Sequence, residues 1–161
     1  KPLIFGEFDR NIVVINGDSL DNLTEYTFFV NGTAGGIASW NSLSDIRLKK
    51  NIKTIDSSLD KVLKLRGVNY EWKDADSKEQ GTRMGFIAQE AEAIIPEVVN
   101  TGGEYLSMQY APITALLVEA VKEQQKIIEK LQQENKNLEE KLNKLDDLQT
   151  QIDDLKRIIS K

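Results

Sequence analysis

The pattern of apolar and polar residues divides the chain of 161 residues into three regions. Residues 1–43 contain short runs of β-branched and aromatic side chains, "NIVVING" and "YTFFVNG", each closed by an Asn-Gly pair typical of turns. Two such strands bury too little apolar surface to fold alone. We therefore expect residues 1–43 to be the end of a larger β-structured stem.

Residues 44–112 mix helical and strand patterns. The segment "SSLDKVLKL" has apolar residues at helical spacing behind a capping residue, Asp56 or Ser57. The segments "VNYEW", "RMGFIA" and "EYLSMQY" are predicted strands, and "AQEAEAII" is a short helix ended by Pro96. This alternation indicates a small mixed α/β domain.

Residues 113–161 contain no Gly or Pro and carry apolar residues at heptad spacing, which predicts a helix of about 70 Å. After Leu145 the apolar stripe shifts by three residues, as in a stammer. A stripe this narrow and long needs other copies of itself, although its mixed a positions do not distinguish a dimer from a trimer. The predicted parallel coiled-coil core consists of the d positions Leu117, Gln124, Leu131, Leu138 and Leu145 and the a positions Val121, Ile128, Asn135 and Leu142.

Composition narrows the possible functions. The net charge is -5 and no region is strongly basic, so nucleic acid is a poor candidate partner. No apolar run approaches the ~18 residues of a membrane span. The chain has no His and no Cys, which excludes Ser-His-Asp and Cys-His catalysis and thiolate or imidazole metal sites. We expect no metal and no cofactor.

The segment "LSDIRLKK" offers the best candidate for chemistry. A serine needs a base to become a nucleophile, and without histidine Lys49 is the candidate base for Ser44. The Ser44 hydroxyl can reach the carbonyl of Leu43 through a five-membered ring, which would cut the chain between the two residues. Alternatively, Ser44 caps a polar turn beside Asp45 and the lysines are solvated, and for an isolated serine this is the commoner role.

The surrounding sequence resembles a known family. The blocks "SDIRLKKNI", "LDKVLKLRGVNYEWK", "GFIAQEAEAIIPEVV" and "YLSMQYAPITALLVEAVKEQQ" follow one another over about residues 44–130. They resemble the C-terminal intramolecular chaperone auto-processing domain of endosialidase-type phage tailspikes and tail fibres. A similar module is present in related phage and bacterial surface fibres and in the myelin regulatory factor of animals.

The resemblance implies both an assembly and a reaction. Such domains form homotrimers with a C-terminal triple coiled coil, assist assembly of the preceding β-structured stem, and release themselves with a serine-lysine dyad that cleaves before the serine. The matching residues are Ser44 as nucleophile, Lys49 as base and Leu43–Ser44 as the scissile bond. Asp45 and Arg47 also match the motif, and we expect them to shape the loop.

The sequence thus predicts an α+β chain with a stem end at 1–43, a chaperone domain at 44–112 and a coiled-coil helix at 113–161. It would be a self-cleaving serine endopeptidase that acts once, in a virion tail fibre or in a prophage or bacterial surface fibre folded in the host bacterial cytoplasm. Its partners would be two further copies and its own stem. The alternative is a trimerisation and attachment module of a surface fibre that does not cleave.

Overall fold

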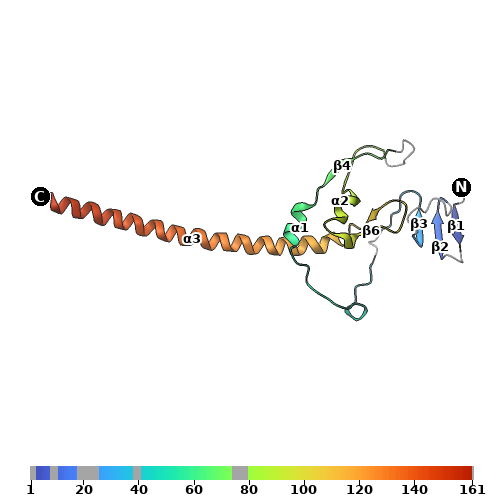
Figure 1. Cartoon of the computed structure of the whole chain (residues 1–161), viewed down its shortest axis with the longest axis horizontal. Coiled ribbons are helices and arrows are strands. Elements are labelled where there is room, and N and C mark those ends of the chain that lie inside the picture. The colour runs from blue at the N-terminus through green and yellow to red at the C-terminus, as the bar shows by residue number, and fades with distance from the viewer. Residues whose placement is uncertain (1–2, 8–10, 18–25, 38–40, 74–79, 161) are drawn as a thin grey trace.

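The computed structural model describes residues 3–7, 11–17, 26–37, 41–73 and 80–160. The residues outside these ranges are parts of the predicted stem, residues 74–79, and Lys161 at the end of the predicted helix. The molecule is elongated, with a small sheet near the N-terminus, a head of short elements, and one helix that projects away from both (Figure 1).

The N-terminal sheet has the strand order β1-β2-β3. Strand β1 is antiparallel to β2, whereas β2 is parallel to β3. Asn16 adopts the left-handed conformation expected of a turn (φ 58°), but the Asn-Gly pair does not close a hairpin between β2 and β3, because parallel strands need a longer connection. The strands are β1 (Ile4–Glu7), β2 (Ile12–Ile15) and β3 (Phe28–Val30).

The head combines short helices with two-stranded sheets, which confirms the predicted mixed α+β class. Strands β4 and β5 are antiparallel, as are β6 and β7. The strands are shorter than their apolar runs, and β6 was not predicted. The elements are η2 (Ile46–Leu48), α1 (Ser58–Lys64), β4 (Val68–Tyr70), β5 (Arg83–Gly85), α2 (Ala88–Glu92), η3 (Pro96–Val98), β6 (Val99–Asn100) and β7 (Ser107–Met108).

The core of the head lies where α2 and η3 meet the start of the long helix α3 (Ile113–Ile159). Side chains from α1 and from the segment before it pack around this cluster. The first turns of α3 are therefore part of the head, although the sequence assigns them to the coiled coil. The buried residues of the cluster are Ala91, Ile95, Val98, Ile113 and Leu116.

Helix α1 begins where the sequence predicts but is capped differently. Ser57 is the N-cap residue, yet it is left-handed (φ 52°) and its side chain makes no capping hydrogen bond. The carboxylate of Glu123 on α3 accepts hydrogen bonds from the backbone N–H groups of Ser58 (3.0 Å) and Leu59 (2.8 Å) instead. A negative charge at a helix N-terminus also interacts favourably with the helix dipole. This contact fastens α1 to α3.

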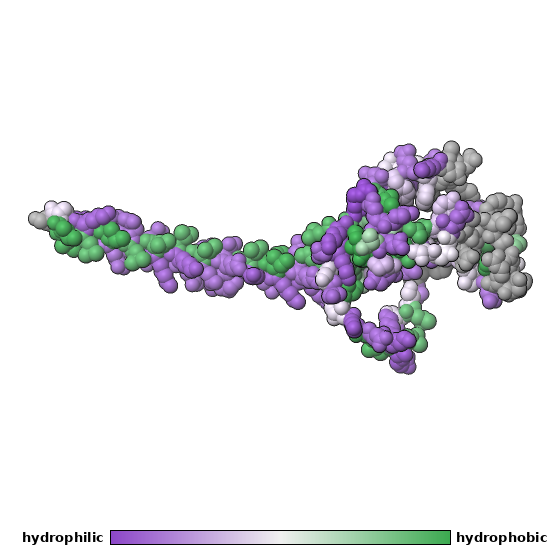
Figure 2. Space-filling view, in the orientation of Figure 1, coloured by the Kyte–Doolittle hydropathy of each residue, from purple (hydrophilic) through white to green (hydrophobic). Residues whose placement is uncertain are grey.

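The predicted C-terminal helix is confirmed as one unbroken helix of 47 residues. Every described side chain after Glu123 is exposed, including the predicted core positions from Gln124 to Leu145. Apolar side chains run along the helix beside polar ones (Figure 2). Their burial by other copies stays a prediction. Among the described residues, no helix combines the length and hydrophobicity needed to cross a membrane.

Candidate functional site

Ser44 and Lys49 lie in the extended connection between the N-terminal sheet and α1. This connection swings away from α3 and the rest of the head and returns to α1 (Figure 1). Among the described residues of this connection, the one regular element is η2, a single 3-10 turn. All the predicted site residues of the cleavage motif lie on or beside this turn.

Asp45 and Arg47 hold the turn together. The Asp45 carboxylate accepts a hydrogen bond from the backbone N–H of Arg47 (2.8 Å) and caps the turn. The guanidinium of Arg47 donates to the same carboxylate through Nε (3.0 Å) and Nη2 (2.7 Å). These bonds lower the pKa of Asp45 and raise the pKa of Arg47. Asp45 and Arg47 therefore stabilise a 3-10 turn that the sequence did not indicate, and their role in cleavage stays a prediction.

The turn brings Lys49 back to Ser44. The backbone N–H of Lys49 donates to the carbonyl of Ile46 (3.1 Å), which ends the turn. Beyond it, Lys49 Nζ lies 2.8 Å from Ser44 Oγ. This is the heavy-atom distance that direct proton transfer between a serine and its base requires.

The dyad is paired but open to water. Ser44 and Lys49 are both exposed, and Leu43, on the other side of the candidate scissile bond, is 88% exposed. Lys49 Nζ donates a hydrogen bond to Ser44 Oγ, whereas a general base has to accept the proton of the serine hydroxyl. Apolar Ile46, Leu48 and Ile52 on the same loop are also exposed. The structure thus pairs the two side chains and leaves the pair open to water.

Other reactive groupings are scarce in the described part of the chain. It contains no group of three or more acidic side chains able to hold a metal ion. Glu90 on α2 forms an exposed ion pair with Arg66, which lowers the pKa of Glu90. This carboxylate is therefore occupied in holding α2 to the segment after α1. The loop around Ser44 remains the best candidate site.

A known protein family matches part of the chain. The family model "Chaperone of endosialidase", which describes a peptidase-type family, matches residues 44–100 and begins at Ser44. Residues 44–100 belong to this family, and they form a chaperone domain of the kind found in phage fibres.

The relatives are fibre proteins and a regulatory factor. The chain is 36% identical over 137 residues to long tail fiber protein Gp37 of Enterobacteria phage T2, and equally identical to that of phage K3. These matches cover 76% of this chain but only 10% and 11% of the fibre proteins. Myelin regulatory factor homolog 1 of Caenorhabditis elegans is 40% identical over 73 residues, covering 40% of this chain and 8% of its own.

Proposed function

We propose that this chain trimerises the β-stem of a tail fibre, sets its register, and then releases itself by cutting the bond between Leu43 and Ser44. The observation that carries the cleavage proposal is the 2.8 Å contact between Lys49 Nζ and Ser44 Oγ, at the first residues of the family match. The proposal divides the chain into a stem end at 1–43, a chaperone domain at 44–112 and a coiled coil at 113–161.

The chaperone role follows from how fibre stems fold. Interwoven β-structures have many long-range contacts and exposed strand edges while they form, so they fold slowly and are prone to aggregate. A coiled coil that associates rapidly raises the local concentration of the stem ends. The exposed apolar stripe of α3 is suited to this association, and α3 extends away from the N-terminal sheet (Figure 1).

The cleavage reaction needs the serine, the lysine and one water molecule. Neutral Lys49 accepts the proton of Ser44 while Ser44 Oγ attacks the carbonyl carbon of Leu43. The C–N bond then breaks, the Ser44 nitrogen takes a proton, and the Leu43 acyl group is left as an ester on Ser44 Oγ. Water hydrolyses the ester, giving a Leu43 carboxylate and a free Ser44 with a new N-terminal amine.

Exposure of the dyad makes cleavage depend on assembly. Burial of the loop would favour the neutral amine and strengthen interactions with the developing oxyanion. The side chains of Ile46, Leu48 and Ile52 are apolar and exposed. They provide a surface against which another copy or the stem would pack and bury the loop. We therefore expect cleavage to follow trimer assembly, so that the chaperone domain is released only after the stem ends are in register. The setting would be a virion tail fibre that folds in the host bacterial cytoplasm.

The test is the intact mass of the purified protein, followed over days together with its oligomeric mass by light scattering. We compare the wild type with Ser44→Ala and Lys49→Ala, and use Lys50→Ala as the matched control on the neighbouring exposed lysine. We expect a break between residues 43 and 44 in the wild type and the control, and none in the two dyad variants. All four proteins should be trimers.

A single intact trimer in all four samples would favour a different function, a trimerisation and attachment module that does not cleave. The observation that favours this alternative is the exposure of Ser44 and Lys49 to water. Expression behind a complete fibre stem then decides between the two, since cleavage that appears only with the stem present agrees with dependence on assembly. An intact protein in that setting would contradict autoproteolysis.

A further inference from the structure

The heptad pattern of α3 continues backward into the head. Thr114 lies one heptad before the a position Val121, and Tyr110 lies one heptad before the d position Leu117. Thr114, Tyr110 and Leu117 line an open groove of about 290 Å³ between α1, the residue after β5 and α3. No lining residue is charged. The remaining lining residues are Val62, Leu65, Phe86 and Ile113.

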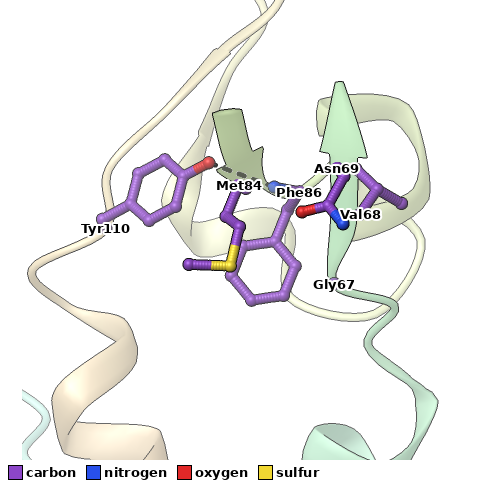
Figure 3. Close-up of a pocket in the computed structure, with 7 residues that line it drawn as sticks. Gly67, Val68, Asn69, Met84, Phe86 and Tyr110 are labelled. Carbon is purple, nitrogen blue, oxygen red and sulfur yellow. Dashed lines mark hydrogen bonds between the residues drawn. The ribbon is translucent and has the colours of Figure 1, made fainter. Parts of the chain in front are cut away.

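Tyr110 is held firmly at one wall of this groove. Its hydroxyl accepts a hydrogen bond from the backbone N–H of Phe86 (3.1 Å), and the two rings are 5.8 Å apart (Figure 3). The hydroxyl lies over Gly85, where an added Cβ would be 2.5 Å from it. A larger residue at position 85 would therefore displace Tyr110. The line of a and d positions is thus tied to strand β5.

A second open groove shares the two aromatic residues Phe86 and Tyr110 with the first. It has a volume of about 540 Å³ and is lined by Phe86 and Tyr110 together with residues of β4 and β5. Met84, which also lines this groove, is 85% exposed (Figure 3). The apolar surface therefore extends from α3 across the head rather than stopping at Leu117.

We infer that the occupant of the groove between α1 and α3 is a second copy of this chain, so that the coiled-coil interface continues into the head. This inference rests on the proposed parallel association of α3. Copies that meet at Leu117 and Val121 bring their Thr114 residues together about one turn earlier on α3. Tyr110 precedes the helix and lines the same groove. An uncharged groove on that line matches the same surface of a neighbouring copy.

The consequence is that the heads are fixed around the axis, and not only tethered to it. Tyr110 contacts both the interface and the backbone of Phe86, so packing at the axis sets the position of β5. The order of each head then depends on its neighbours. A fixed arrangement of heads holds the stem ends in register, which a flexible attachment to a coiled coil would not do.

Disulfide cross-linking tests this inference, because the natural chain has no cysteine. Thr114→Cys reports the groove, and Leu142→Cys, also at an a position, reports the coiled coil. Ala115→Cys is the matched control at an exposed position one residue away on α3. After oxidation of the full chain, we expect linked dimers of the Thr114 and Leu142 variants on non-reducing gels, and monomers of the Ala115 variant.

The other outcomes separate this inference from the proposed function. Linked Leu142→Cys with unlinked Thr114→Cys would overturn the continued interface while leaving the coiled coil standing. If neither variant is linked, the proposed association itself fails and the inference with it. Equal linkage of Ala115→Cys and Thr114→Cys would mean random collision and would overturn the inference too.

A second measurement does not depend on disulfide geometry. Thr114→Arg places a charge in the groove at an exposed helical position, so the isolated head should still fold. We expect a dissociation constant at least about tenfold higher by sedimentation equilibrium, since a buried unpaired charge is costly. Ala115→Arg should leave it unchanged. Equal dissociation constants for wild type and Thr114→Arg would overturn the inference.

Discussion

The two parts of α3 place one continuous helix in two different environments. Between residues 113 and 123 it buries Ile113, Leu116 and Ala120 against its own head, leaving them 7%, 5% and 3% exposed. Beyond Glu123 every described side chain is exposed, and Leu142 is 59% exposed. The difference teaches that helix formation and helix burial are separate matters, since one continuous backbone carries both environments.

The two parts also use different faces. The buried residues of the first part are spaced three and four residues apart, and Ile113 and Leu116 pack with side chains of α1 and α2. The predicted coiled-coil positions begin at Leu117 and remain exposed. A helix with one face on its own chain and another face free can hold a head at a fixed angle to an assembly. The first part would therefore set the geometry and the second the association.

The largest expected effect comes from a charge in the second part. Leu138→Asp places a carboxylate at a predicted d position, and we expect association to weaken by about a hundredfold or more because burying an unpaired charge costs several kcal/mol. Light scattering over a concentration series measures this. Asn137→Asp adds the same charge at the neighbouring exposed position and should associate like the wild type. Equal weakening by both variants would contradict the predicted seam.

A core truncation in the first part of α3 should lower the stability of the head and leave association unchanged. Leu116→Ala truncates a buried side chain of the head cluster. We expect the free energy of unfolding to fall by about 2–3 kcal/mol, at the low end of the range for leucine because the core is small. Hydrogen exchange of the α2 and η3 amides should accelerate while the oligomeric mass stays the same. Leu142→Ala is the matching truncation in the second part of α3. Loss of the oligomer in Leu116→Ala but not in Leu142→Ala would contradict the separate roles of the two parts.

The smallest of these effects concerns Glu123, which lies at the boundary between the two parts of α3 and binds α1. Glu123→Ala leaves the N–H groups of Ser58 and Leu59 without their acceptor, and the loss of a helix cap costs about 1–2 kcal/mol. Amides of α1 should then exchange about tenfold faster or more, without change in the rest of α3. Glu129→Ala removes an exposed glutamate farther along α3 and should leave α1 unchanged. Unchanged exchange in Glu123→Ala would show that the contact does not stabilise α1.

Much of α3 could be predicted because its signals are local. A long segment without Gly or Pro, with apolar residues at heptad spacing, specifies a helix whatever surrounds it. The short strands were harder: "EYLSMQY" alternates over its whole length, yet only Ser107–Met108 pairs with a partner. Pairing depends on a second strand being present, and the sequence of one strand does not contain that information.

The candidate site shows the same limit at smaller scale. The family resemblance identified Ser44 and Lys49, but a spacing of five residues does not bring two side chains together in most loop conformations. The turn that does so depends on Asp45, whose carboxylate binds both the backbone and the side chain of Arg47. An Asp followed two residues later by Arg was the available signal, and it is too common to be decisive.

The sequence by itself determined the long C-terminal helix, the family of residues 44–100, and the absence of histidine and cysteine chemistry. The reason is that propensity, periodicity and motif identity are properties of neighbouring residues. Only the tertiary structure decided that α3 completes the core of the head, that Glu123 caps α1, and that Tyr110 is fixed against β5. These are contacts between residues far apart in the chain, and their free energy exists only once the chain has brought them together.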